Sequence, residues 1–183
     1  MVTIPNFENG ILPVADYEVT FKELRESVLV NGCGDLRERY WDKEWRNMLV
    51  GNLEIMVNQL WQVGVKNIFI NGSFVEEKDH PNDIDGYFEC DLKYLAGGEL
   101  QMALNLLEPD KIWTWHQATR KPYKGYPKKQ LPMWHKYRVE LYPHVPGLMS
   151  GIKDKFGNEL EFPAAFRISR SDDKPKGIVK IIR

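Results

Sequence analysis

A long helix leading directly into a β-strand is the feature that most limits how this chain can fold. Within residues 36–63, apolar side chains recur at steps of three and four, the spacing of one helix face. They are Trp45, Leu49, Leu53, Met56 and Leu60, with Met48 and Val57 widening the stripe. Gly64 is placed to end the helix, and the apolar run 65–70 is predicted to be a strand. This order predicts a fold of the α/β (α+β) class.

Size and composition favour one domain in a reducing compartment. The chain has 183 residues, of which 43% are hydrophobic, enough for one core, so we expect a single domain over residues 1–183. The formal net charge of -1 gives no overall attraction for nucleic acid or membrane. No apolar run is long enough to cross a bilayer, and the first residues do not resemble a signal peptide. Cys33 and Cys90 suit reduced thiols, so we expect a cytoplasmic protein.

The remaining sequence predicts short elements between loops. Residues 1–20 are predicted to be irregular because Pro and Gly interrupt short apolar pieces. Thr20 and Glu23 have capping-box spacing, which predicts a helix over 21–30. Further predictions are a helix over 92–108 weakened at Gly97-Gly98, a strand over 136–142, a short helix from Asn158 to Phe166, a turn at 171–175 and a strand over 177–182.

Two aspartates follow the predicted strand 65–70 after a Gly-Ser pair and a charged loop. Strand residues i and i+2 share a face, so Asp83 and Asp85 are predicted to lie side by side, with Ile84 facing the core. Adjacent carboxylates repel each other unless a cation lies between them, and Mg²⁺ takes oxygen ligands. Singly, a Gly-Ser pair is usually a turn and an Asp-x-Asp a solvated loop. The combination behind an apolar strand favours a cation site.

Glu140 supplies a candidate third carboxylate. Residues 136–142 alternate in the manner of a strand, which places Glu140 in its middle. Three carboxylates on neighbouring strands can hold two divalent cations, which activate an attacking oxygen and neutralise a triphosphate leaving group. Gly72 lets the backbone approach a phosphate, and Ser73 can bind phosphate oxygens. The competing interpretation is that Glu140 only pairs with Arg138 or a loop lysine.

A basic segment follows the predicted helix 92–108. Residues 111–139 hold eight basic side chains and no acidic one, so the rest of the chain has 17 basic against 26 acidic residues, a net of -9. The part 117–133 is rich in Pro and Gly and is predicted to be a long basic loop. Tyr123 and Tyr126 are interleaved with the lysines, so 117–138 is a candidate surface for a triphosphate or for a protein, RNA or DNA acceptor. A solvated loop without a partner is the alternative.

The pattern resembles the nucleotidyltransferase superfamily of DNA polymerase β. Its motif is Gly-Ser, a short gap and Asp-x-Asp, with a third acid on a later strand; here nine residues separate Ser73 from Asp83. The chain resembles still more closely an uncharacterised bacterial and phage family of nucleotidyltransferase-like proteins. That likeness lies in Phe-Glu-Asn-Gly-Ile-Leu-Pro at 7–13, in the motif at 71–86 and in Lys-Gly-Ile-Val within 175–179. The resemblance implies a minimal nucleotidyltransferase fold, with a mixed β-sheet flanked by helices.

The resemblance also implies site residues and a reaction. The metal-binding and catalytic set is Asp83, Asp85 and Glu140, and Gly72 and Ser73 would hold the β- and γ-phosphates. Apart from the resemblance, Lys78 is a candidate phosphate contact because it lies in the motif loop, although loop lysines are usually only exposed. Glu140 would also be the base for the acceptor hydroxyl. The implied activity uses Mg²⁺ or Mn²⁺ and transfers a nucleoside monophosphate from an NTP to a hydroxyl of a protein, RNA or small molecule. The alternative is a catalytically weak binding protein of this fold, an antitoxin-like or phage-encoded regulator that acts through a protein or nucleic-acid partner.

Overall fold

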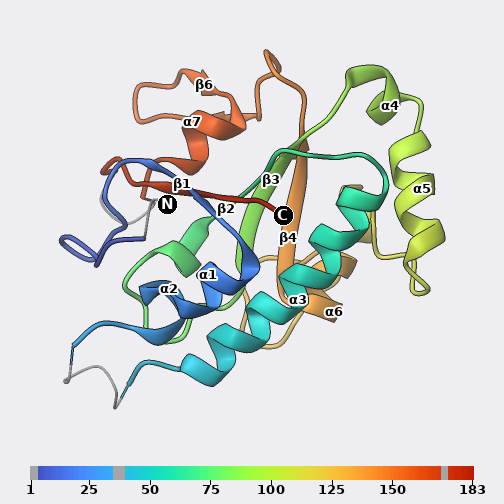
Figure 1. The fold of residues 1–183 in the computed structure, drawn as a ribbon. Helices are drawn as coiled ribbons and strands as arrows, with labels where there is room; N and C mark the ends of the chain where they lie inside the picture. Colours follow the sequence, from blue (N-terminus) through green and yellow to red (C-terminus); the bar gives the residue numbers. More distant parts are fainter. Residues whose placement is uncertain (1–3, 35–39, 170–172) are drawn as a thin grey trace.

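A five-stranded mixed sheet forms the centre of the computed structural model, which describes residues 4–34, 40–169 and 173–183 (Figure 1). Its order is β1-β7-β2-β3-β4, with bounds β1 Asp16–Val19, β7 Ile178–Ile181, β2 Ile68–Asn71, β3 Ile84–Glu89 and β4 Val139–His144. The pairs β1–β7 and β3–β4 are parallel, whereas β2 runs antiparallel to both β7 and β3. The predicted α/β (α+β) class, with a mixed sheet flanked by helices, is confirmed.

Helices cover both faces of this sheet. They are α1 Phe21–Glu26, α2 Val28–Asn31, α3 Lys43–Gln62, α4 Leu92–Ala96, α5 Glu99–Leu107, α6 Pro132–Tyr137 and α7 Phe162–Phe166, with 3-10 turns η1 Gly72–Val75 and η2 Gln117–Thr119. On one face α3 packs with α1, α2, α5 and α6 over the main core. On the other face α7 packs on Tyr87 and Phe69, beside a small hairpin of β5 Ile152–Lys153 and β6 Glu159–Leu160.

Most of the predicted helix stripe lies at the centre of the main core, but Met48, predicted to widen the stripe, is 40% exposed. Leu49, Leu53, Met56 and Leu60 are fully buried. The Asp42 side chain caps the helix by accepting a hydrogen bond from the Trp45 amide at 2.9 Å. The sequence predicts that this helix begins at residue 36. Residues 36–39 lie outside the described residues, and residues 40–42 are not helical.

Two predictions near the N-terminus were wrong in part. The helix predicted over 21–30 is divided at Ser27, whose extended backbone ends α1 while its hydroxyl accepts from Leu29 N and caps α2. The capping box itself, Thr20 with Glu23, is confirmed. The segment 1–20 is not irregular throughout. Its last part forms β1 because it pairs with the distant β7, which no local pattern indicates.

The strand predicted over 136–142 begins later than expected. Pro132 opens α6, which continues to Tyr137 and ends where Arg138 takes the left-handed conformation with φ 55°. The strand β4 then runs through Pro143 to His144. Pro143 is tolerated there because β4 lies at the edge of the sheet.

Elements toward the C-terminus followed the predictions more closely. The helix 92–108 is divided at Gly97-Gly98 as expected, with Gly98 at φ +76°. The strand β7 lies within the predicted range 177–182. The helix α7 begins after Glu161 instead of Asn158, because the Asn158 side chain donates to Asp154 within the β5–β6 turn. Part of the turn predicted at 171–175 lies outside the described residues.

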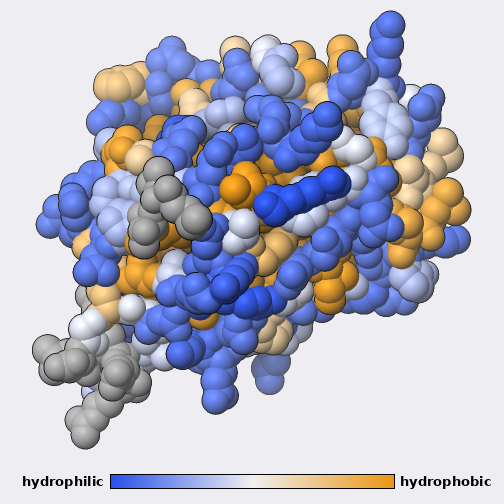
Figure 2. Space-filling view, viewed as in Figure 1, coloured by the Kyte–Doolittle hydropathy of each residue, from blue (hydrophilic) through white to orange (hydrophobic). Residues whose placement is uncertain are grey.

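Figure 2 shows that hydrophobic side chains gather over α5 at the right of the view, beside a largely hydrophilic surface. Met102, Leu106 and Leu107 of this helix are exposed. Across the described helices, none has the combination of length and apolar character that crossing a membrane requires. Cys33 and Cys90 are free thiols, and burial raises the pKa of Cys90 to about 11.

A buried polar network around Glu108 connects α3 to α6. Glu108 is 1% exposed and accepts hydrogen bonds from Gln59 and Tyr137, both at 3.0 Å, and from Lys136. Gln59 also accepts from the indole of Trp113 at 2.6 Å. Burial acts to raise the pKa of Glu108, but these hydrogen bonds outweigh it and lower the pKa to about 2. Since α6 leads into β4, the network helps to position the start of that strand.

We expect Glu108 to make stability acid-dependent. Its folded pKa is depressed, so its contribution is complete above the ordinary value of 4.5 and is lost as pH falls toward about 2. Glu108→Gln should lower the free energy of unfolding at neutral pH by on the order of 3 kcal/mol and flatten its dependence on pH below 4.5. Urea unfolding at a series of pH values measures both effects. Equal acid sensitivity in the variant and the wild type would contradict this role.

Candidate active site

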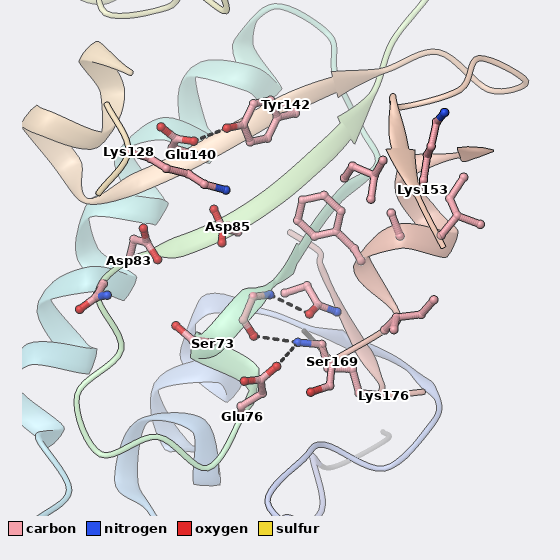
Figure 3. A pocket seen from close by; sticks show the side chains of 18 of the residues that line it. Ser73, Glu76, Asp83, Asp85, Lys128, Glu140, Tyr142, Lys153, Ser169 and Lys176 are labelled. Atoms are coloured by element: carbon pink, nitrogen blue, oxygen red, sulfur yellow. Dashed lines mark hydrogen bonds and ion pairs between the residues drawn. The ribbon is translucent and has the colours of Figure 1, made fainter. Parts of the chain in front are cut away.

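A large pocket of about 1280 Å³ lies on the α7 face of the sheet. Its inner end is formed by the strand ends that carry the sequence motif, and its sides by the basic loop and the β5–β6 hairpin (Figure 3). Typical small-molecule sites have about 300–1,000 Å³, so the pocket has room for more than one small ligand. Five of the six predicted site residues lie at or near the inner end: Gly72, Ser73, Asp83, Asp85 and Glu140.

The Gly-Ser turn is held against the neighbouring strand. The fully buried Asn71 ends β2, and its side chain accepts from Gly72 N at 2.7 Å and donates to Gly177 O at 3.1 Å. Gly72 has φ +72°, and a Cβ there would lie 2.8 Å from Oδ2 of Asp85. Only glycine fits this position, for reasons of both backbone conformation and space. The turn therefore brings Ser73 to the side of the carboxylates.

The two aspartates lie as the alternation predicts. Ile84 is fully buried, while Asp83 and Asp85 are half-buried and line the pocket. Asp85 belongs to β3, and Asp83 directly precedes that strand. The indole of Trp134, which is itself fully buried, donates to Oδ2 of Asp83 at 2.7 Å. The tryptophan fixes one face of this carboxylate, and α6 supplies it.

Glu140 lies in register with Asp85 on the adjacent parallel strand, but its carboxylate has its own partners. It is 5% exposed; Oε1 accepts from Leu131 N at 3.0 Å and pairs with Arg120 at 3.3 Å, and Oε2 accepts from the Tyr142 hydroxyl. In the described part of the chain, no group of three or more His, Cys, Asp or Glu side chains is placed to hold a metal ion. The two aspartates lie on the same face of the pocket, whereas the Glu140 carboxylate pairs with the Arg120 guanidinium of the basic loop.

The competing interpretation, in which Glu140 pairs with Arg138 or a loop lysine, was right that Glu140 pairs with a basic side chain, but that side chain is Arg120. Arg138 stacks instead on Trp134, with its guanidinium 3.8 Å from the ring centroid. Burial and the Glu140 charge raise the pKa of Tyr142. Burial acts to lower the pKa of Arg120, but its bonds to Tyr142 and Glu140 raise it overall. The cluster therefore contains a neutral phenol between a charged guanidinium and the carboxylate.

Lys176 is a site residue that sequence reasoning missed. Its side chain is 3% exposed, and Nζ donates to Gly72 O at 3.1 Å and pairs with Glu76. A buried ammonium therefore lies directly behind the Gly-Ser turn, as Figure 3 shows. The available signal was the Lys-Gly-Ile-Val sequence near the C-terminus. Lys78, which the sequence did single out, lines the same pocket and is exposed.

The basic segment is a loop over most of the predicted range. After η2, it extends from Arg120 to Leu131. An isolated bridge between Lys121 and Gln130 ties its two arms together, and the Arg120 guanidinium donates to Lys129 O at 3.1 Å. Within this loop, Arg120 forms a salt bridge with Glu140, and the loop forms one side of the pocket. The prediction of a long basic loop is thus correct apart from η2 and the start of α6.

Gly72→Ala should disturb the site more than its backbone angle alone explains. We expect the free energy of unfolding to fall by about 1 kcal/mol because of the positive φ, and by about 1–3 kcal/mol more because the new Cβ would contact Asp85. Gly98→Ala is the matched control, because Gly98 has φ +76° and open space around its missing Cβ. Chemical unfolding of both variants measures the difference. Equal losses would contradict the close packing between Gly72 and Asp85.

The chain belongs to a family of unknown function, DUF6932, whose profile matches residues 5–182. Searches of curated proteins and of solved structures found no significant match.

Proposed function

We propose that this protein is a nucleotidyltransferase dependent on Mg²⁺ or Mn²⁺, which transfers a nucleoside monophosphate from an NTP to a hydroxyl acceptor. The observation that carries the proposal is the packing of the Gly72-Ser73 turn against Asp85, with Asp83 on the same face, at the inner end of a large pocket. A glycine-serine turn that lines the pocket beside two carboxylates suits the phosphates of a nucleotide together with a hard cation.

The proposed roles follow from the position of each side chain. The turn binds the β- and γ-phosphates through the Ser73 hydroxyl and the Ser73 N–H, because the Gly72 N–H already donates to the Asn71 side chain. Lys176, paired with Glu76, holds the turn by donating to Gly72 O. Asp83 and Asp85 hold the metal, since two half-buried carboxylates on one strand face are oxygen donors of the kind Mg²⁺ uses. When bound, the metal supplies charge neutralisation on the triphosphate.

Glu140 has a more restricted role in this proposal. Its carboxylate already accepts from Leu131 N, Arg120 and Tyr142, so it can serve as a ligand or base only after Arg120 withdraws. In the arrangement described here, Arg120 provides the positive charge beside Glu140 that a second cation would otherwise provide. We therefore assign the metal first to Asp83 and Asp85, and treat Glu140 as the base that an arriving acceptor exposes.

Transfer should depend on the aspartates. Purified protein with Mg²⁺ and α-phosphate-labelled NTPs, supplied with lysate fractions as acceptors, is expected to yield a labelled product. Asp83→Asn should lower the rate by at least about 100-fold, because charge stabilisation is lost. Glu26→Gln removes an exposed carboxylate from α1 and should leave the rate unchanged. Equal labelling by Asp83→Asn and the wild type, or none by any protein with any fraction, would overturn the proposal.

Metal binding can be tested apart from transfer. The hydrogen bond between Trp134 and Asp83 makes this indole a local reporter, so adding Mg²⁺ should change the tryptophan emission. The change should be lost in both Trp134→Phe and Asp83→Asn and kept in Trp61→Phe, whose ring lies against Phe21 away from the pocket. A change that persists without Trp134, or that needs no aspartate, would place the metal elsewhere.

A nucleotide-binding regulator without transfer is the second candidate. The capture of Glu140 by Arg120 favours it, because the third carboxylate is then withheld from a metal. This candidate predicts Mg²⁺-dependent NTP binding with no labelled product, and a stoichiometric protein partner that remains bound in Asp83→Ala and Asp85→Ala. Loss of that partner in both variants would favour the enzyme.

A further inference from the structure

The positive charge of the basic loop faces solvent beside the pocket. Its four lysines are Lys121, Lys124, Lys128 and Lys129. All four are exposed, and none of them forms an ion pair within the described residues. Three other basic residues of 111–139 differ: Arg120 pairs with Glu140, Lys136 pairs with Glu108 and Asp110, and Arg138 stacks on Trp134. The loop lysines therefore form a group of exposed positive charges in a chain whose remainder is acidic.

Basic side chains also occupy the opposite side of the pocket. Lys128 and Lys129 line it from the loop, and Lys153 and Lys155 line it from the hairpin. Figure 3 shows Lys128 and Lys153 on opposite sides. The nearby Asp154 carboxylate accepts from Phe156 N and Asn158 N, both at 2.9 Å, within its own turn. A chain of negative charges lying across the pocket would meet lysines on both sides.

Aromatic rings accompany these lysines. On the hairpin, Phe156 lines the pocket and is 80% exposed, far more than a packed phenylalanine. On the loop, Tyr126 lines the pocket, and Tyr123 is 42% exposed with the Arg138 guanidinium 4.3 Å from its ring centroid. The two tyrosine rings pack on each other and on Trp134, so Phe156 offers the more open surface. An exposed ring beside phosphate-binding charges can stack on a base, the combination that single-stranded nucleic acid requires.

We propose that the pocket mouth, between the loop lysines and the β5–β6 hairpin, binds single-stranded nucleic acid. The lysines contact phosphates on both sides of the strand, and Phe156 stacks on a base. The strand lies across the same pocket as Asp83 and Asp85. An acidic peptide would satisfy the lysines but would leave the exposed Phe156 ring unused. Binding of this kind needs no transfer reaction, so it stands or falls separately from the proposed activity.

Fluorescence anisotropy of a labelled single-stranded RNA of about 12 nucleotides tests the proposal. The protein carries Asp83→Asn, so that transfer cannot contribute. With four phosphate contacts, log K should fall with log salt at a slope of about -3, an affinity loss of about 50-fold between about 50 and about 200 mM salt. No binding at the lower salt concentration, or an affinity independent of salt, would overturn the proposal.

Matched variants locate the surface. Lys124→Gln, Lys128→Gln and Lys129→Gln together should reduce the slope to about -1 and weaken binding at low salt by at least about 10-fold. The control, with the same charge change at exposed lysines outside this pocket, combines Lys22→Gln, Lys66→Gln and Lys93→Gln and should bind as the parent does. Equal weakening by both sets would mean a general charge effect and would contradict the assignment of RNA binding to the loop lysines.

The stacking contribution has its own test. Phe156→Ala should weaken RNA binding by at least about 5-fold while leaving the salt slope unchanged, and the 80% exposure of Phe156 means that folding should not suffer. Competition with polyglutamate of similar length addresses the peptide alternative. Polyglutamate that displaces the RNA at equal concentration, or a Phe156→Ala variant that binds like its parent, would show a surface for any polyanion and would refute specificity for nucleic acid.

Discussion

The register of β3 between β2 and β4 is the constraint on which the candidate site depends. Asn71 of β2 lies opposite Asp85, and Asp85 lies opposite Glu140 of β4, so one row across three strands carries the turn, the carboxylate and the third acid. Gly86 permits this approach, because a Cβ there would lie 2.3 Å from Phe69 O. A slip of one residue would turn both aspartates into the core, where no cation or water could meet them.

The electrostatics of the row are resolved differently at its two ends. At the Gly72 end, Lys176 is buried and pairs with Glu76 behind the turn. At the β4 end, Arg120 pairs with Glu140, and Tyr142 bridges the two. Leaving a buried charge unpaired is costly, so each of these cations also maintains the local fold. The pair with Arg120 also occupies the Glu140 carboxylate, which is in register with Asp85.

Different kinds of surface meet at the pocket. Strand ends supply carboxylates and a turn at its inner end, whereas a loop and a hairpin supply lysines and aromatic rings at its mouth. The first kind suits a nucleotide with a cation, and the second suits a longer polyanion. The combination explains how a chain with a net charge of -1 can present a locally positive surface.

Local sequence patterns were sufficient to predict the main helix, the strand that follows it and the face that carries the two aspartates. The stripe of α3, the strand β2 and the shared face of Asp83 and Asp85 follow from periodicities of 3.6 and 2, which the backbone imposes within a few residues. The Gly-Ser turn beside them followed from the same stretch. The placement of Glu140 on a strand next to Asp85 was also foreseeable, although Pro132 and Arg138 shift the start of that strand.

Only the tertiary structure decided the partners of these residues. Glu140 meets Arg120 from 20 residues earlier because the basic loop folds back onto β4, and Lys176 reaches Gly72 from 104 residues away because β7 inserts between β1 and β2. The pairing of β1 with β7 joins the two ends of the chain in the same way. Such contacts depend on which segments pack together, and no periodicity within a segment encodes that choice. The sequence by itself therefore determined the aspartate face and its turn, and the packing decided which cations surround them.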